Sequence, residues 1–446
     1  MGQSTVHIVH CIDTEGPLYE PLRETFGRLY DIFGLEIEPT LQNLRKIQNR
    51  EIDLGGIEDE VAKVFSADLL AYNDSWDKVD KMLEDLMSPA YRNQMVDSFG
   101  QGWVYNWFCL DFVGFKTNRR RRDAGFHNIF DHYAEVLEKN GASRDGLHFH
   151  HHPIPFSGEG HHCATHYFSH TPIIFEILAR RIIDRQWFPN SNRPGFHTTR
   201  PDSHWLMEQH IPFDIANQSC DHADLIHKDL TPGRFGDWRR APKTWRPYHP
   251  NTDDYQVEGN SRRWIARCLN IGSRLRLLGA HDVDKAFSEA AEGKPVVLAF
   301  THHDFRDMRP AIEDVRTLIK DSAARYPGVN FRYCEAREAM REALRLETRA
   351  PIEFSLSLQE STLRIEADAP TFGPQPFLAL KTRTGQYFHD NLDFEQPFRS
   401  WSYFFDESTF SLDAIEAIGV GAADATGNVS VSVLDPITGK TVNRNW

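Results

Sequence analysis

Residues 6–15 read VHIVHCIDTE, a strand-like apolar run that ends on two carboxylates. Two later runs end in a similar way: residues 145–153 read DGLHFHHHP, and residues 296–304 read VVLAFTHHD. The three predicted strand ends therefore carry Asp with Glu, a histidine tract, and His with Asp. In an α/β barrel the reactive groups gather at the C-terminal ends of the strands. The three stretches together predict an α/β barrel with one reactive site.

The first two of these stretches contain the parts of a mononuclear metal site. His148 and His152 stand at i and i+4, a spacing at which two imidazoles can converge on one ion. A carboxylate from the end of the first strand can complete the protein ligands and leave one position open for water. Such a set suits Zn²⁺ and also admits cobalt, nickel or iron. A solvated histidine-rich loop is the alternative interpretation of the tract alone.

Roughly residues 5–345 resemble the polysaccharide deacetylase family, carbohydrate esterases of the NodB-homology fold, in the order in which their motifs occur along the chain. Asp13 and Glu15 stand in a D-x-E arrangement like that of the family's first motif. His148, His152 and Pro153 match its His-x-x-x-His-Pro motif. The resemblance implies a role for each matching residue: Asp13 as general base, Glu15, His148 and His152 as metal ligands, and His303 as the general acid, with His302 as its less favoured neighbour.

The chain also departs from the family pattern. Glu15 stands where aspartate is more usual and reaches one methylene further, and the insertion after the first motif is long. The middle motif normally offers an arginine near proline and glycine. Residues 193–201 contain two candidates, Arg193 and Arg200; the sequence does not choose between them, and both are predicted substrate contacts.

The implied chemistry also follows from the residue types. A divalent ion polarises an amide carbonyl and lowers the pKa of a bound water. Asp13, two residues from Glu15, can stay off the metal and accept the proton of that water. A histidine titrates in the range needed to protonate the leaving amine, so His303 is expected to donate from the opposite side. The alternatives are a turn residue for Asp13 and a helix-start residue for His303.

Two domains are expected from the change of pattern along the chain. Residues 1–348 are predicted to form the distorted (β/α) barrel of NodB type, with a mostly helical insertion at 27–102 over the barrel top. From residue 349 short apolar strands alternate with Gly, Pro, Asp and Asn turns, which predicts a small β-sandwich at 349–446.

Substrate contacts are predicted in two further places. Residues 116–122 read KTNRRRR, and a basic run after a predicted strand suits an anionic group such as a diphosphate or a sugar carboxylate; Arg120 and Arg121 are its candidates. A solvated loop is the alternative. Trp245 lies in an irregular, aromatic-rich stretch at 232–255, where an exposed ring would suit a sugar.

Composition limits the setting of the protein. A net charge of −14 over 446 residues argues against general nucleic-acid or membrane-surface binding. No apolar run approaches the length of a membrane span, and no signal peptide is recognised. Six scattered cysteines without a CxxC pair indicate reduced thiols of a cytoplasmic protein, and Cys163 is expected to be a buried structural thiol.

These observations favour a metal-dependent N-deacetylase that acts on an N-acylated amino sugar. The expected substrate is a cytoplasmic glycan or surface-polysaccharide precursor, lipid-linked or nucleotide-linked. An acyl-exchange enzyme that replaces one N-acyl group by another is the nearest alternative, followed by a deformylase or an amidohydrolase of non-sugar amides. A non-catalytic glycan-binding protein is the alternative from another class, although binding alone requires neither a base nor an acid.

Overall fold

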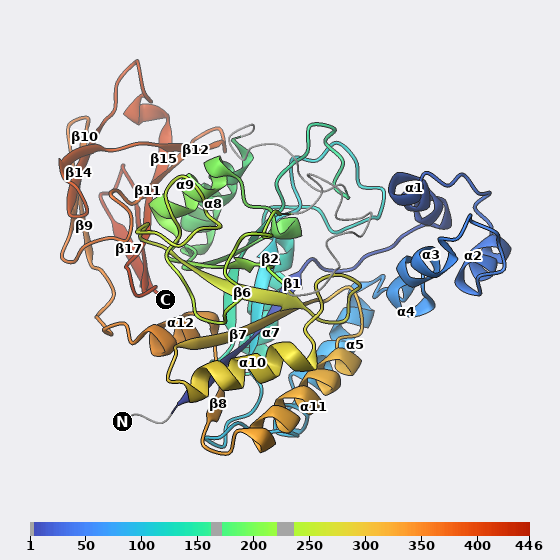
Figure 1. Ribbon diagram of the computed structural model, residues 1–446. Coiled ribbons are helices and arrows are strands. Elements are labelled where there is room, and N and C mark those ends of the chain that lie inside the picture. The colour runs from blue at the N-terminus through green and yellow to red at the C-terminus, as the bar shows by residue number, and fades with distance from the viewer. Residues whose placement is uncertain (1–3, 162–171, 221–235) are drawn as a thin grey trace.

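A computed structural model describes residues 4–161, 172–220 and 236–446, so Cys163 lies outside the described residues. Within the described ranges, seven parallel strands close into a barrel, because β1 pairs with β7 along one edge and with β2 along the other (Figure 1). An additional strand, β8, pairs with the first half of β1. The bounds are β1 (Thr5–Thr14), β2 (Tyr105–Leu110), β3 (Gly146–His151), β4 (Ser191–Pro194), β5 (Phe213–Asn217), β6 (Trp264–Asn270), β7 (Val296–His303) and β8 (Asn330–Tyr333).

Apolar side chains fill most of the barrel. Val9 and Cys11 of β1 pack with Ala266 and Cys268 of β6 and with Ala299 of β7. Side chains alternate between the two faces of a strand, so the next inward position of β1 after Cys11 is occupied by Asp13. The apolar filling therefore ends at a carboxylate at the C-terminal end of the barrel.

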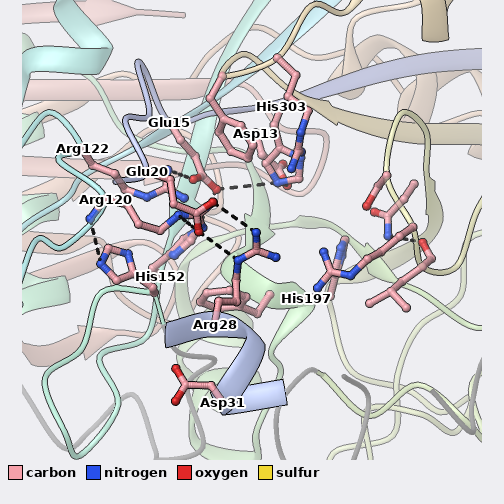
Figure 2. A pocket seen from close by; sticks show the side chains of 18 of the residues that line it. Asp13, Glu15, Glu20, Arg28, Asp31, Arg120, Arg122, His152, His197 and His303 are labelled. Carbon is pink, nitrogen blue, oxygen red and sulfur yellow. Dashed lines mark hydrogen bonds and ion pairs between the residues drawn. The ribbon is translucent and has the colours of Figure 1, made fainter. Parts of the chain in front are cut away.

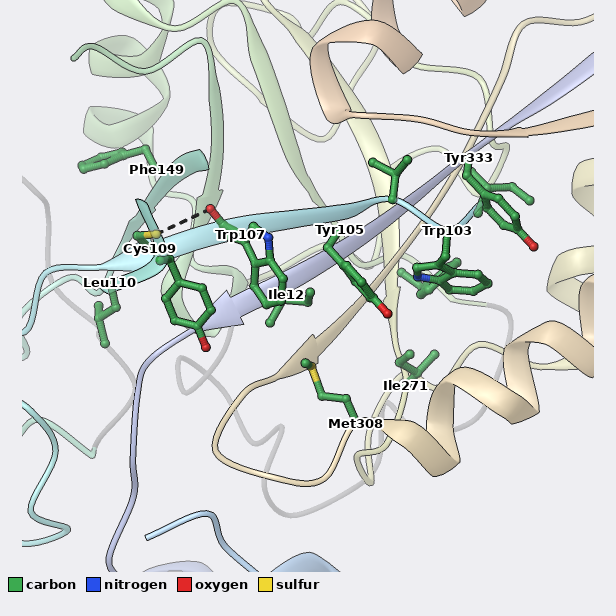
Figure 3. Packing of buried hydrophobic residues seen from close by; sticks show 14 of the residues in the cluster. Ile12, Trp103, Tyr105, Trp107, Cys109, Leu110, Phe149, Ile271, Met308 and Tyr333 are labelled. Atoms are coloured by element: carbon green, nitrogen blue, oxygen red, sulfur yellow. Dashed lines mark hydrogen bonds between the residues drawn. The ribbon is translucent and has the colours of Figure 1, made fainter. Parts of the chain in front are cut away.

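Larger apolar side chains cover the outside of the barrel. Tyr105 and Trp107 lie on β2, and Trp103 precedes this strand by two residues. All three pack near Met308, the residue before α11 (Figure 3). The helices that flank the strands are α5 (Trp76–Leu86), α6 (Pro89–Arg92), α7 (Asn128–Lys139), α8 (Ile173–Arg185), α9 (Pro201–His210), α10 (Ala280–Ala291), α11 (Arg309–Arg325) and α12 (Ala336–Leu344).

The insertion after β1 is helical, as the sequence predicted. Four short helices project from the barrel (Figure 1) and bury a small core of their own, which includes Phe26, Leu29, Ile47 and Val61. Their bounds are α1 (Leu22–Phe33), α2 (Leu41–Gln48), α3 (Glu58–Val64) and α4 (Ala67–Leu70). Because α1 begins at Leu22, helical structure starts five residues earlier than predicted.

Residues 349–446, all of which the structure describes, contain two antiparallel sheets. Leu363 and Trp401 of one sheet share a buried core with Leu380 and Val420 of the other, which is sandwich packing. The first sheet consists of β9 (Phe354–Gln359), β10 (Thr362–Ala367), β13 (Asp393–Gln396) and β14 (Ser400–Phe404). The second consists of β11 (Phe377–Thr382), β12 (Tyr387–Asp390), β15 (Ile415–Ala423), β16 (Val429–Leu434) and β17 (Thr441–Asn445).

The predicted α/β barrel and the later change to antiparallel sheets are thus confirmed. In the part of the chain that the structure describes, no helix combines the length and the apolar character that crossing a bilayer requires.

Candidate metal centre

Three buried side chains converge at the C-terminal end of the barrel: Glu15 after β1, and His150 and His152 at the end of β3. One potential ligand atom from each lies within 4.8 Å of the others. The Nε2 atoms of the two histidines are 3.1 Å apart, and Glu15 Oε1 lies 3.3 Å from His152 Nε2 and 3.9 Å from His150 Nε2. We call these three residues the metal triad.

The structure does not bring His148, which the sequence predicts as a ligand, into the metal triad. The spacing i, i+4 brings side chains together on a helix, but residues 146–151 form a strand, in which four residues span about 13 Å. Neighbours on one face of a strand are i and i+2, which is the spacing of His150 and His152. His148 lies deeper in the barrel, with its Nε2 3.1 Å from Asn106 Oδ1 and 3.3 Å from Glu335 Oε1.

The donor atoms of the metal triad fit a divalent ion. Ligand atoms bound at 2.0–2.1 Å in a tetrahedron stand about 3.3 Å apart, close to two of the three measured separations. The Nδ1–H of His150 donates to the carbonyl oxygen of Arg193 at 2.6 Å. This bond fixes the tautomer and leaves the Nε2 lone pair directed at the other two residues, as a hydrogen bond from the second ring nitrogen commonly does in metal-binding histidines. Burial lowers the pKa of His150 to about 4, so this ligand is neutral at neutral pH.

Arg122 holds the outer oxygen of Glu15. The two side chains are buried and form an ion pair between Arg122 Nη1 and Glu15 Oε2, while Oε1 of the same carboxylate faces the histidines (Figure 2). Burial alone would raise the pKa of Glu15, but the charges of Arg122 and His152 outweigh it and hold this pKa well below its usual range. Glu15 is therefore an anion at neutral pH and is oriented by Arg122.

Asp13 lies beside the metal triad without belonging to it. Its Oδ1 accepts a hydrogen bond from Nε of the fully buried Arg193, and it is 3.8 Å from His150 Nδ1. Arg193 also donates to the carbonyl oxygen of Ile215 at 3.1 Å, which fixes the guanidinium in the barrel. Burial opposes ionisation of Asp13, but Arg193 and His150 lower its pKa overall. The carboxylate is thus charged and held in one orientation.

His303 at the end of β7 completes the site. β7 pairs with β1 in a register that places His303 opposite Asp13, and His303 Nε2 lies 3.6 Å from Asp13 Oδ2 and 3.8 Å from Glu15 Oε1. Burial lowers the pKa of His303 to about 3 despite the two nearby carboxylates. The resting imidazole is therefore neutral, in contrast to the expectation that it titrates near neutral pH. His302 faces away from the pocket, with Nδ1 2.9 Å from the carbonyl oxygen of His303.

A strained segment after β4 supports His152. Phe196 and His197 both have positive φ angles, 53° and 51°, although neither is glycine. The Phe196 ring packs 4.8 Å from that of His152. A Cβ on Gly195 would come within 2.2 Å of the His152 ring, so glycine is required for this close approach.

Asp304 fixes the turn that carries Glu15. Its carboxylate accepts the backbone N–H groups of Glu15 at 2.9 Å and Gly16 at 2.8 Å, and the hydroxyl of Tyr133 at 2.8 Å. All three donors are buried with it. Asp304, which follows β7, therefore positions Glu15, the carboxylate of the metal triad.

A pocket of about 510 Å³ opens over the metal triad, within the range of small-molecule sites. Its walls come from α1 and from the loops that follow β2, β3, β6 and β7. Arg119, Arg120 and Arg122 from the basic run line it. Arg121 does not, because its guanidinium stacks over the ring of Tyr19, 4.8 Å from the centroid.

Three other predicted substrate contacts are corrected. Trp245 is fully buried and donates its Nε1–H to the carbonyl oxygen of Asp282, so it belongs to the hydrophobic core. Arg200 caps the start of α9 and is not among the residues that line the pocket. Arg193 lies behind Asp13, is not among the residues that line the pocket, and positions that carboxylate.

Several residues of the site were missed from the sequence. His150 was detectable, because a strand at 146–151 places positions 150 and 152 on one face. His197 carried a weaker signal, as it stands four residues after Arg193, whose Nη2 lies 3.0 Å from its ring. Arg28 gave no local signal, since it reaches the pocket from an inserted helix, whereas Arg306 stands only three residues after His303 in the loop that follows β7.

Comparisons with known proteins assign no family. No family model matches the chain, and no curated protein matches it. A crystal structure of bovine butyrophilin matches at 16% identity over 22% of this chain and 42% of that chain, with a TM-score of 0.10. The alpha-toxin of Clostridium perfringens from an avian strain matches at 11% identity over 37% of this chain and 59% of that chain, with a TM-score of 0.11. The chain thus spans about half the length of these structures, and likenesses at such TM-scores bear on neither fold nor function.

Proposed function

We propose that this protein is a metal-dependent hydrolase that removes an acyl group from the nitrogen of an amino sugar. One observation carries the proposal: an ionised carboxylate, Asp13, and an imidazole, His303, stand within 4 Å of the metal triad without belonging to it. A site that only binds a ligand or an ion requires neither group, whereas hydrolysis requires a group that accepts a proton and one that delivers it.

The resemblance to polysaccharide deacetylases supports the reaction class. Asp13 and Glu15 of the D-x-E motif meet His152 and His303 of the later motifs at one end of the barrel. The correspondence is partial, because His150 takes the place that the His-x-x-x-His pattern gives to His148. The sugar and the acyl group of the proposed substrate are taken from this resemblance.

Each residue has a distinct task in the proposed reaction. A divalent ion, when bound by Glu15, His150 and His152, polarises the scissile carbonyl and activates water. Asp13 accepts the proton of the attacking water at Oδ2, and Arg193 keeps this carboxylate ionised until then. His303 is neutral at rest, so its Nε2, 3.6 Å from Asp13 Oδ2, can take up that proton. It then delivers the proton to the leaving nitrogen.

The test is an activity screen of the metal-loaded protein on N-acetyl, N-formyl and longer N-acyl amino sugars, with release of the free amine as the readout. Asp13→Asn should keep its metal and lose about 10²–10⁴-fold in turnover. Asp111→Asn is a matched control, because Asp111 is also buried against an arginine, 2.6 Å from Arg181 Nη2, but lies outside the pocket. The proposal fails if no N-acyl substrate is cleaved, or if Asp13→Asn retains near-normal turnover.

A further inference from the structure

The pocket over the metal triad has an unusual charge balance for so acidic a chain. Among the described residues that line it, seven are arginines and five are carboxylates, and two of those carboxylates are Asp13 and Glu15 of the reactive centre. The protein as a whole carries a net charge of −14. The arginines reach the pocket from separate parts of the chain, so a single basic segment does not explain them.

Two of these arginines contact Tyr72 and a third is connected to it through Glu20, and we call Arg28, Arg120 and Arg306 the arginine cluster. Arg120 Nη2 donates to the hydroxyl of Tyr72 at 2.9 Å. The guanidinium of Arg306 lies over the ring of Tyr72, 5.3 Å from the centroid. Arg28 reaches the same place from α1, where it donates to Glu20 at 3.0 Å (Figure 2).

Glu20 is the carboxylate that pairs with Arg28 and Arg120 of this cluster. It is buried and accepts hydrogen bonds from Arg28 and from the Tyr72 hydroxyl, and it lies 3.6 Å from Arg120. Two guanidiniums and a hydroxyl hold the pKa of Glu20 at about 2, so the carboxylate contributes one full negative charge. Glu20 thus supplies one negative charge among the three guanidiniums.

Arg306 is the member whose charge is least compensated. Its Nε donates to the carbonyl oxygen of Leu69 at 3.1 Å, and its guanidinium contacts the rings of Tyr72 and Phe305. Within the described part of the chain no carboxylate oxygen lies within 4.0 Å of it. Burial and the nearby charges of Arg120, Arg274 and Arg28 lower its pKa to about 10. The buried Nε of Arg120 makes no hydrogen bond to the described atoms, but it lies 3.6 Å from Glu20 Oε1.

We infer that the arginine cluster is a binding subsite for an oxyanion, a phosphate or a carboxylate group carried by the substrate. Guanidinium groups present paired N–H donors that match the oxygens of both anions. An anion placed among the three arginines would give Arg306 the charged partner that no described carboxylate supplies. The subsite opens into the same pocket as the metal triad, so one molecule can reach both.

This inference deepens the proposed function and rests on it only for the statement that the anion belongs to the substrate. Binding of a simple anion can be measured without turnover and without metal. The probes are inorganic phosphate, pyrophosphate and malonate, titrated calorimetrically into the full chain after treatment with EDTA, so that no metal offers a second anion site. The first two represent phosphoryl groups and malonate represents carboxylates.

The parent protein should bind at least one of these anions, with an affinity that falls as salt is added. Arg306→Gln should weaken that binding about 10- to 100-fold, and Arg306→Lys should weaken it less because the charge remains. Arg309→Gln is the matched control: Arg309 lies three residues further on, is paired with Asp307 at 2.9 Å and does not line the pocket, so anion affinity should be unchanged. If Arg306→Gln does not fold, Arg120→Gln replaces it and should show the same loss.

The outcomes separate this inference from the proposed function. Absence of binding by the parent to all three anions, or equal binding by the parent and the Arg306→Gln variant, overturns the oxyanion subsite even if N-acyl sugars are hydrolysed. Anion binding that depends on Arg306 supports the subsite even if no hydrolysis is found. Stronger binding of pyrophosphate than of malonate would indicate a phosphorylated substrate, and the reverse a carboxylated one.

Discussion

Replacing Arg193 by methionine removes the cation that faces Asp13 and leaves the carboxylate buried in the barrel. Asp13 is 4% exposed and Arg193 is fully buried, so solvent cannot take over the role of the guanidinium. Breaking a buried ion pair from one side typically costs about 3–5 kcal/mol. We therefore expect Arg193→Met to lower the free energy of unfolding by about that amount at neutral pH.

The loss of unfolding free energy in Arg193→Met should depend on pH, because a protonated Asp13 is neutral and no longer needs a cationic partner. In the parent the folded-state pKa of Asp13 is lowered, so its contribution to stability is present above its unfolded pKa and is lost as the pH falls through the folded pKa. In Arg193→Met the folded pKa is raised instead, and protonation costs about 1.4 kcal/mol for each pH unit above the unfolded value. The deficit of the variant should therefore be about 2 kcal/mol smaller at pH 5 than at pH 8.

Denaturant unfolding of the metal-free parent, Arg193→Met, Asp13→Asn and the double variant measures this coupling. The double variant should be more stable than the sum of the two single losses predicts, because it contains no unpaired buried charge. As a control, Arg181→Met removes the partner of Asp111 elsewhere in the barrel and should destabilise the protein while sparing turnover. A stability loss in Arg193→Met that is independent of pH, together with additive effects in the cycle, would refute the reasoning.

Three further changes probe the surroundings of the site. Gly195→Ala should displace the His152 ring and weaken metal binding at least ten-fold in a chelator competition, and unchanged affinity would show that the segment yields without strain. Arg122→Gln should release Glu15 and lower metal affinity about 10- to 100-fold in the same competition assay. A loss of this size is typical when a residue that orients a metal ligand is replaced. Trp245→Ala should cost about 3–5 kcal/mol of stability and leave KM unchanged for any substrate found. A raised KM in a well-folded variant would indicate that Trp245 contacts the substrate after all.

The fold could be predicted from the sequence where the signal was local. The apolar run of β1 and the polar residues after it indicated both a barrel strand and the end of the barrel that carries the site. The turn-rich pattern after residue 349 indicated antiparallel sheets for the same reason. In these segments each side chain's neighbours are set by the period of the strand.

The site was harder to predict, because its members depend on geometry that the sequence does not display. His148 was preferred to His150 because the spacing of helical metal ligands was applied to a strand, where the period is two. Trp245 lies in an irregular segment that looks like a binding loop, yet tertiary packing buries it in the core. Arg306 reaches the pocket through long-range packing against Tyr72 that no motif records.

The metal content of the purified protein and of two single variants tests the central claim most directly. After loading with Zn²⁺ and removal of the excess, elemental analysis should find one ion per chain in the parent. His148→Ala should retain that ion, since His148 faces Asn106 and Glu335, while His150→Ala should lose most of it. Loss of the metal from His148→Ala with full retention in His150→Ala would contradict the account.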